Sequence, residues 1–328
     1  MLMTNRGLAF AALAVVLCGG ALLAAPTSYD HAASSGKSTK TTTTGVPPPP
    51  ADLAWPELTD DEQEQSVKLL KKMADEAQAK LHRPLQLYET KYFLFYTDLS
   101  AREGKNWSGL LDRMYARLCE TFGVPGGKNI WRGKGLVFVF SKPEDYLRFE
   151  SEIAHTPAKG TAGMCHSVSN GLDFIAFYRQ PDEMQFAHVL VHESTHGFVH
   201  RYRSKVFVPS WANEGLAEVI ATDLVPQRGH RDQVKTAARE ALQQHRNSME
   251  DFFTAEHIQG WQYPVAQMLC EFMITAGKKN YVDFINGIKD GLSWDEAMTT
   301  RYKAPVDRLV PVFGQWLGLK NLSPGTKE

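Results

Sequence analysis

The chain has 328 residues, of which 43% are hydrophobic and 22% are charged. This composition allows a substantial buried core. It therefore excludes a chain that is disordered along its whole length, and it predicts a soluble folded body of one or two domains. The formal net charge is -1, which gives no electrostatic reason to expect nucleic acid or an anionic membrane surface as a partner.

The first 25 residues are predicted to be a targeting segment. Arg6 is followed by the apolar run GLAFAALAVVLCGGALLAA, and the first acidic residue is Asp30. This pattern is typical of a secretory signal peptide. An uncleaved N-terminal membrane anchor is the alternative, because about 17 or more apolar residues can span a bilayer. We therefore expect a protein that is secreted, periplasmic or held at the cell envelope by a membrane tether.

Residues 26–51 are rich in Ser, Thr and Pro and contain almost no large apolar side chains. Such a segment cannot bury enough surface to offset its ordering entropy, so we expect a disordered linker. The predicted folded domain follows at 52–320, with a tail at 321–328. The domain contains three cysteines, and we expect buried thiols rather than a disulfide, because free cysteine is commonly a core residue. These cysteines are Cys119, Cys165 and Cys270.

The first part of the domain, residues 52–182, is predicted to combine helices and strands. Thr59 is a suitable N-cap for a helix over 60–82, and Gly123 closes a second helical pattern that begins near Ser108. Alternating or wholly apolar segments predict strands. These segments are 86–98, 135–141 and two strands within 164–178 around the tight-turn pair Asn170-Gly171.

The second part, residues 183–320, shows helical periodicity in almost every window. The predicted helices are 183–203, 211–223, 230–246, 262–276, 278–289, 293–300 and 305–317. The sequence therefore predicts an α+β protein with a small mixed β-sheet N-terminal to a largely helical half. The helix over 183–203 would lie between the two.

That helix carries four histidines at intervals of four residues, His188, His192, His196 and His200. The inner pair belongs to His-Glu-Ser-Thr-His, the HExxH pattern, and residues four apart lie one turn apart on one helix face. Both imidazoles can therefore reach one metal ion. Glu193 flanks this face and can act as the general base that hydrolysis requires. The outer pair lies at opposite edges of the face, so we expect it to support the site or the helix.

A second segment, PSWANEGLAEVI at 209–220, has the pattern of an amphipathic helix and carries Glu214. A hairpin of two helices would place Glu214 opposite His192 and His196, which gives the His2Glu ligand set of catalytic zinc. Glu218 lies one turn further. We expect it either to orient one of the histidines or to be a solvated surface carboxylate.

These two segments resemble the signature of the gluzincin metallopeptidases, in which HExxH precedes an Asn-Glu-Gly-x-Ala segment that supplies the third ligand. Here Asn213–Ala217 matches that segment. With YPVAQMLCEFM at 263–273 and a helical tail that ends in VPVFGQWLGL, the chain is similar to peptidase-MA-like secreted proteins of bacteria over about residues 86–318. The resemblance implies a zincin-like fold and Zn²⁺ as the cofactor.

Two features depart from the related aminopeptidases. No Gly-x-Met-Glu-Asn segment precedes the histidines, and the spacing to Glu214 is one residue shorter, so aminopeptidase activity is not favoured. The resemblance also implies that a strand within 164–178 binds extended substrate. By its position in the pattern, Tyr263 would be the oxyanion donor. Its alternative role is that of a half-buried aromatic residue at a helix start.

The sequence thus predicts a secreted or envelope-associated zinc metallopeptidase that acts on a peptide or protein substrate. One alternative is an inactive binding or scaffold protein of the cell envelope with a structural metal, and another is a hydrolase of a non-peptide amide. His166, His245 and His257 lie outside these patterns, and we expect them to have no part in the site.

Overall fold

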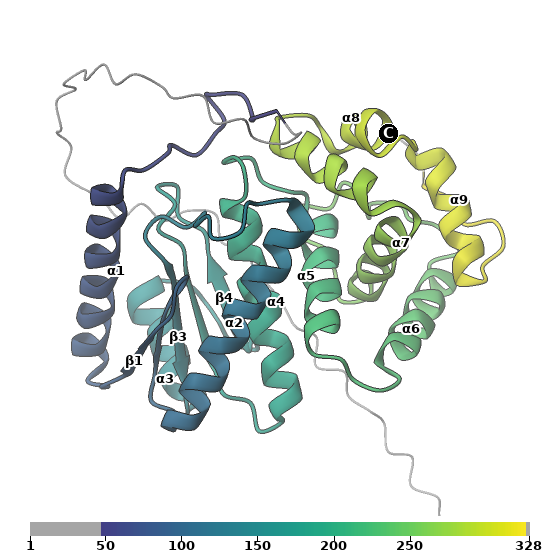
Figure 1. Cartoon of the computed structure of the whole chain (residues 1–328). Coiled ribbons are helices and arrows are strands. Elements are labelled where there is room, and N and C mark those ends of the chain that lie inside the picture. Colours follow the sequence, from purple (N-terminus) through teal and green to yellow (C-terminus); the bar gives the residue numbers. More distant parts are fainter. Residues whose placement is uncertain (1–46, 326–328) are drawn as a thin grey trace, which may run out of the picture.

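The computed structural model describes residues 47–325 and confirms the predicted α+β architecture, with one mixed sheet before a largely helical half (Figure 1). The predicted signal or anchor at 1–25, most of the predicted linker and the last three residues of the predicted tail lie outside the described residues. Within residues 47–325, none of the helices combines the length and the apolar character that a membrane span requires.

The sheet has five strands in the order β1-β2-β3-β5-β4. The strands are β1 (Gln86–Glu89), β2 (Phe93–Thr97), β3 (Gly135–Phe140), β4 (Gly163–His166) and β5 (Phe174–Tyr178). The three central strands run parallel, whereas β1 and β4 pair antiparallel at the two edges. The strand β4 is therefore an edge strand.

The segment predicted as one strand over 86–98 is a hairpin of β1 and β2. The turn forms at Thr90, because its hydroxyl accepts hydrogen bonds from the backbone N–H groups of Tyr92 (3.3 Å) and Phe93 (3.0 Å). Aromatic and aliphatic residues continue on both sides of this turn, which is why the sequence pattern alone suggests an unbroken strand.

Alternate residues of the central strands enter two separate cores, as the pleat of a strand requires. In β2, Phe93 and Phe95 face one core, and Leu94 and Tyr96 face the other. Helices α2 and α4 cover the first face of the sheet, and α1 and α3 cover the second (Figure 1). The bounds of these helices are α1 (Asp60–Leu81), α2 (Ala101–Phe122), α3 (Pro143–Phe149) and α4 (Glu183–Arg201).

Helix ends follow the predicted capping signals where the sequence provides them. Thr59 forms a capping box with Glu62 at the start of α1, and Gly123 adopts a left-handed conformation (φ 67°) at the end of α2. The sequence did not predict α3, which continues into a π-helical turn at Glu150–Ala154. This helix has only seven residues, too few for a helical period to stand out.

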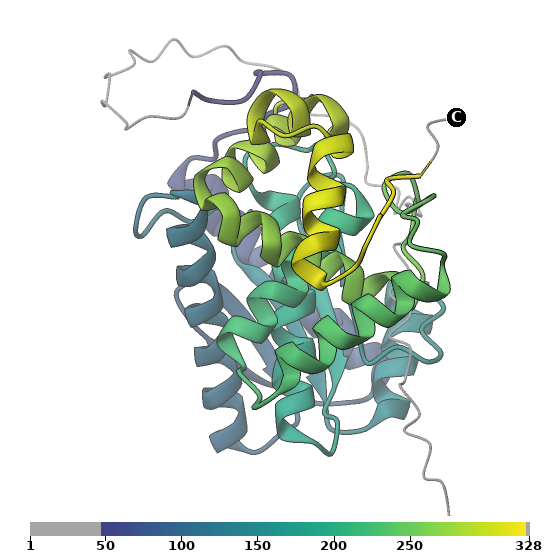
Figure 2. The same cartoon turned by 90° about the vertical axis from the view of Figure 1, so that its right-hand side faces the viewer.

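The helical half packs outward from α4, with α5 between α4 and α7 and with α6 and α9 on the outer side (Figure 2). These elements are α5 (Ser210–Leu224), α6 (His230–Gln244), α7 (Gln262–Lys289), α8 (Trp294–Ala297), a π-helical turn at Met298–Tyr302, and α9 (Val306–Leu317). The sequence predicted two helices in the region of α7. Gly277 is extended there (φ −176°), so α7 is interrupted at the predicted point.

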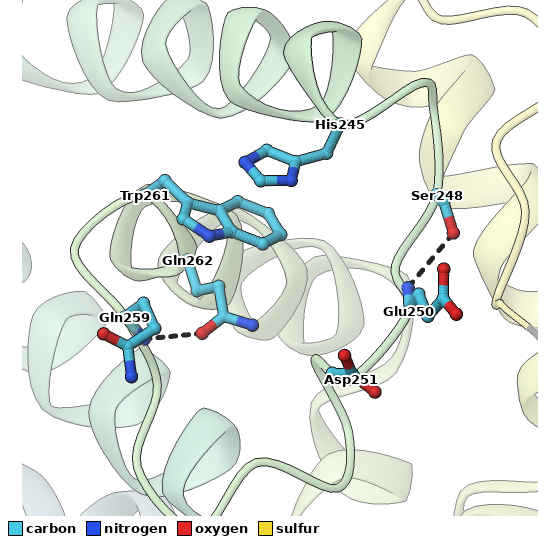
Figure 3. Close-up of a pocket in the computed structure, with 7 residues that line it drawn as sticks. All are labelled: His245, Ser248, Glu250, Asp251, Gln259, Trp261 and Gln262. Carbon is cyan, nitrogen blue, oxygen red and sulfur yellow. Dashed lines mark hydrogen bonds between the residues drawn. The ribbon is translucent and has the colours of Figure 1, made fainter.

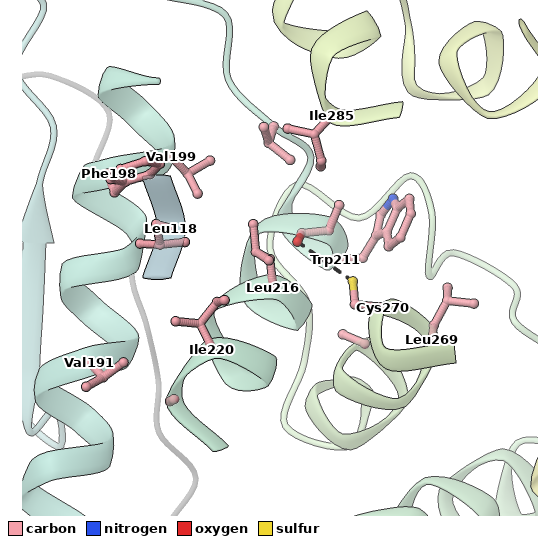
Figure 4. Close-up of a cluster of buried hydrophobic side chains, with 14 of the residues drawn as sticks. Leu118, Val191, Phe198, Val199, Trp211, Leu216, Ile220, Leu269, Cys270 and Ile285 are labelled. Carbon is pink, nitrogen blue, oxygen red and sulfur yellow. Dashed lines mark hydrogen bonds between the residues drawn. The ribbon is translucent and has the colours of Figure 1, made fainter. Parts of the chain in front are cut away.

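Apolar side chains fix the separation of α4 and α5. Figure 4 shows Leu216 and Ile220 of α5 pointing toward α4, where Val191, Phe198 and Val199 lie. All five side chains are at most 4% exposed and belong to the larger core. Because this contact is apolar and closely packed, polar groups placed between the same two helices have fixed positions.

The three cysteines among residues 47–325 are free thiols, as predicted. Cys119 and Cys270 are also buried as predicted, whereas Cys165 is partly exposed. The end of the predicted linker contacts the folded body, because Arg203 donates a hydrogen bond to the carbonyl of Pro47 (2.6 Å). An isolated bridge between Ala54 and Ser204 continues this contact along the connection between α4 and α5.

Candidate metal centre

Helix α4 is buried along almost its entire length, from Phe186 to Arg201. Asp182 caps its start, because the carboxylate accepts a hydrogen bond from the backbone N–H of Gln185 (2.9 Å). Apolar residues surround the whole helix, as expected for a helix that packs between a sheet and other helices. Any polar side chain on α4 must therefore find its partners inside the protein.

His192, His196 and Glu214 meet at the interface of α4 and α5, and this group could hold a metal ion. The Nε2 atom of His192 lies 3.1 Å from Nε2 of His196 and 3.2 Å from Oε2 of Glu214. The distance from Nε2 of His196 to the same oxygen is 3.5 Å. The three side chains are at most 4% exposed. The structure thus brings together the three residues that the sequence assigned as metal ligands.

Gly215 explains how α5 reaches this position. A Cβ atom at Gly215 would lie 2.4 Å from the carbonyl oxygen of Ala266 and 2.5 Å from Sγ of Cys270, so no side chain fits there. The glycine allows α5 to lie directly on α7, while its neighbour Glu214 projects toward α4. Trp211, one turn earlier, is fully buried and fixes the start of the helix. The Asn-Glu-Gly segment thus combines a ligand with a close helix contact.

The electrostatics of the ligand group favour an ionised Glu214 beside a positive charge. Burial acts to raise the pKa of Glu214, but His196 and His192 outweigh this effect and hold the pKa at about 2. Burial acts to lower the pKa of His192, but Glu218 and Glu214 raise it well above its usual value. A divalent cation bound by the three side chains would supply this positive charge in place of the protons. The histidines would then be neutral and the carboxylate of Glu214 ionised.

Glu193 lies beside the cluster and is fully buried. Among residues 47–325, neither of its carboxylate oxygens has a hydrogen-bond partner of normal geometry, although the backbone of Cys165 on β4 approaches it. Burial raises the pKa of its carboxyl group, and the nearby His192 and His196 oppose this rise. A buried carboxylate with so few hydrogen-bond partners is costly to the fold, so its position beside the ligand group needs an explanation.

Glu218 connects two histidines of α4. Its Oε1 atom lies 3.1 Å from Nδ1 of His192, and its Oε2 atom lies 2.9 Å from Nε2 of His188. Burial acts to raise the pKa of Glu218, but the two histidines hold it far below its usual range. The carboxylate therefore contacts a ligand, as the first of the two predicted roles requires. The contact with His188 was not foreseen, although the spacing of four residues from His192 is a signal for it.

His200 has a structural contact at the other end of the series. Its Nδ1 atom lies 2.8 Å from Oδ2 of Asp173, and Oδ1 of Asp173 accepts a hydrogen bond from the backbone N–H of Val168 (2.9 Å). His200 and Asp173 are both buried. This pair joins the end of α4 to the connection between β4 and β5. No local pattern indicates Asp173, because the pair joins residues 27 positions apart.

Tyr263 lies in the first turn of α7, half-buried against the main core. This position agrees with its alternative role as an aromatic residue at a helix start, and its role as an oxyanion donor stays a prediction. The histidines expected to lie apart from the site have other surroundings. His166 is 2.9 Å from Glu150, His245 stacks on Trp261, and the side chain of His257 is 41% exposed.

Comparison with models of known protein families finds no match to this chain, and comparison with curated proteins finds no similar sequence. The metal centre is therefore defined by its own geometry. It is a buried group of two histidines and one glutamate that could hold a metal ion, with a second glutamate beside it.

Proposed function

We propose that the protein is a zinc-dependent hydrolase of peptide bonds. In this proposal His192, His196 and Glu214 hold the zinc ion, and Glu193 is the general base. One observation carries the proposal: a three-residue ligand group lies next to a buried carboxylate that has no hydrogen-bond partner of normal geometry among the described residues, and only the backbone of Cys165 approaches it.

The donor set suits zinc. Zinc binds imidazole nitrogen at about 2.0–2.1 Å and carboxylate oxygen at about 2.0–2.2 Å in tetrahedral sites, so two ligand atoms should lie about 3.3–3.5 Å apart. The three distances between the donor atoms, 3.1, 3.2 and 3.5 Å, are close to this value. Three protein ligands leave a fourth tetrahedral position, which is typical of catalytic rather than structural zinc sites.

The residues around the ligands have separate roles in the proposed reaction. When bound, zinc acts as a Lewis acid that polarises a substrate carbonyl and increases the acidity of water. Glu193 accepts the proton of the attacking water and returns it to the leaving amine. The raised pKa of Glu193 makes its carboxylate a stronger base than a solvated glutamate. Glu218 holds the ring of His192 in the orientation that directs Nε2 to the metal.

Two further assignments complete the proposal. The edge strand β4 lies against α4, as a Cβ atom on Gly197 would lie 3.5 Å from Sγ of Cys165, and an extended peptide could pair with such an edge. Tyr263 is the proposed oxyanion donor from α7. The apolar run after Arg6 supports secretion or attachment to the cell envelope.

A binding or scaffold protein with a structural metal is the second candidate. The near-complete burial of the ligands favours it, because a catalytic site must be open to its substrate. Glu193 argues against it, since a structural site has no use for an unpaired buried carboxylate. Hydrolysis of a non-peptide amide would use the same residues and differs only in substrate.

The test combines metal analysis with cleavage of a peptide library. We expect the purified protein to contain one zinc ion, and Glu193→Gln to retain the zinc but lose cleavage. Glu183→Gln is the matched control, because Glu183 is an exposed residue at the start of the same helix. Absence of stoichiometric zinc would refute the proposal. Zinc without cleavage of any peptide would favour the structural alternative, or hydrolysis of another amide if cell-wall amides are cleaved.

A further inference from the structure

A polar cavity lies at the beginning of α7, apart from the metal centre. It has a volume of about 300 Å³ and is formed by the end of α6, the loop that follows it and the first residues of α7 (Figure 3). This volume lies at the lower end of the range for ligand pockets, so it suits a single side chain rather than a large cofactor. None of the residues proposed for hydrolysis lines the cavity.

One wall of the cavity is aromatic. The rings of His245 and Trp261 are parallel within 13°, with their centroids 3.7 Å apart. Trp261 is half-buried and His245 is exposed, and both line the cavity. Stacked rings of this kind form a rigid flat surface, on which a planar or cationic group can pack.

The opposite side of the cavity is negatively charged. Glu250 and Asp251 are adjacent in sequence and exposed, and both line the cavity. Within the described part of the chain, neither carboxylate takes part in an ion pair. Two neighbouring carboxylates without a cation favour a positively charged ligand and disfavour an anionic one.

Gln262 supplies an independent indication of a ligand. Its side chain is almost completely buried, with only 3% of the residue exposed, and it lines the cavity. Its Oε1 atom accepts a hydrogen bond from the backbone N–H of Gln259 (2.5 Å). Its Nε2 group has no hydrogen-bond partner among residues 47–325, and Figure 3 shows this nitrogen pointing away from Gln259, toward the side where Asp251 lies. This nitrogen is not among the fully buried polar atoms that lack a partner, so it is reachable from the cavity and can donate to an acceptor that enters it.

We propose that this cavity binds an arginine side chain of a peptide. The guanidinium group has five donors in a plane, which suits carboxylates and stacking on an aromatic ring. Glu250 and Asp251 bind its charge, and Trp261 packs against its plane. The amide of Gln262 donates a hydrogen bond to a backbone carbonyl of the same peptide. A simple cation has no carbonyl group and could not accept this bond. The site does not depend on the metal chemistry, and it would recognise a basic peptide whether or not the protein cleaves it.

The test uses two small probes that differ in charge but not in shape. N-acetyl-arginine methylamide carries a guanidinium group, and N-acetyl-citrulline methylamide carries a neutral urea group in its place. In calorimetric titrations of the full chain, we expect the arginine compound to bind about tenfold more tightly, with binding that weakens as salt is added. Equal affinity for the two probes, or no binding of either, would overturn the proposal.

Variants locate the binding. Glu250→Gln combined with Asp251→Asn keeps the shape of both side chains, and we expect it to reduce the affinity for the arginine probe about tenfold and to remove the preference over citrulline. Glu256→Gln is the matched control, because Glu256 lies in the same loop, is 93% exposed and does not line the cavity. If the control weakened binding as much as the double variant, the site would be refuted. Thermal unfolding of each variant verifies that it is folded.

Discussion

The Nδ1 atom of His192 lies 3.1 Å from Oε1 of Glu218, while Nε2 of the same ring faces His196 and Glu214. The two nitrogens of one imidazole therefore have different tasks. A carboxylate that accepts a hydrogen bond from the Nδ1–H group fixes the tautomer in which Nε2 carries no proton and can bind a metal, and it makes Nε2 a better electron-pair donor. Glu218 is thus expected to control metal affinity without contacting the metal.

We expect Glu218→Gln to lower the affinity for zinc about 10–100-fold, because the amide keeps the shape of the side chain but loses the charge that orients His192. Competition with a chelator of known affinity measures this change. Glu240→Gln on α6 is the control, since Glu240 is exposed and lies outside the cluster, and it should leave the affinity unchanged. Unchanged affinity in Glu218→Gln would show that the contact with His192 is incidental.

We expect zinc to stabilise the folded protein, because the ligand group is assembled only in the folded chain. At a free zinc concentration 100 times the dissociation constant, the stabilisation is about 2.7 kcal/mol. Thermal unfolding with and without zinc measures it as a rise in Tm. His196→Ala should lose this rise, whereas His257→Ala, at a side chain that is 41% exposed and lies outside the ligand group, should keep it. A rise that persists in His196→Ala would place the zinc elsewhere.

Local patterns predicted most of the fold. Caps such as Thr59 and Gly123 and the periodicity of apolar residues act within a few residues of sequence, so they can be found without the structure. The hairpin at Thr90 was missed because its turn depends on one hydroxyl group rather than on a change of composition. Helix α3 was missed because it is short and gains its stability from burial of Tyr146 and Phe149 against the sheet.

In the metal centre, too, local patterns indicate some residues, whereas other contacts depend on how the elements pack. The pair His192 and His196 can be predicted because both residues are on one helix, and the Asn-Glu-Gly segment indicates Glu214. The contact of His188 with Glu218 and that of His200 with Asp173 could not be assigned, because each joins two elements whose relative position is set by packing. Nothing in the sequence around Asp173 distinguishes it from a residue in a surface turn.

Asp173→Ala should loosen the connection between β4 and β5. It removes the acceptor for both His200 and the backbone N–H of Val168, so we expect a loss of about 1–3 kcal/mol in the free energy of unfolding. Hydrogen exchange should become faster in residues 167–172. Asp173→Asn retains an acceptor oxygen for Val168 and should have a smaller effect. Equal effects of the two substitutions would mean that the hydrogen bond to Val168 does not stabilise this connection.

Lys289 is buried beneath the C-terminal end of α4. Its Nζ atom donates hydrogen bonds to the carbonyl oxygens of Val199 (3.1 Å), His200 (3.3 Å) and Val206 (2.7 Å). Burial nevertheless lowers its pKa from 10.5 to about 7. Between these two values the unfolded chain binds a proton that the folded chain does not, so stability should rise with pH through this window. Below pH 7 both states are protonated, and the cost of burying the charge is present in full.

We therefore expect the free energy of unfolding of the wild type to increase by about 2 kcal/mol from pH 7 to pH 9 through Lys289 alone. Lys289→Met carries no titrating group and should lack this increase. Denaturant unfolding measures the free energy of unfolding of both proteins at the two pH values. The increase in the wild type minus the increase in Lys289→Met is the contribution of Lys289. Lys279→Met, at a side chain that is 85% exposed, should behave like the wild type. The same increase in Lys289→Met as in the wild type would show that the ammonium group keeps its charge inside the protein, held by the three carbonyl groups.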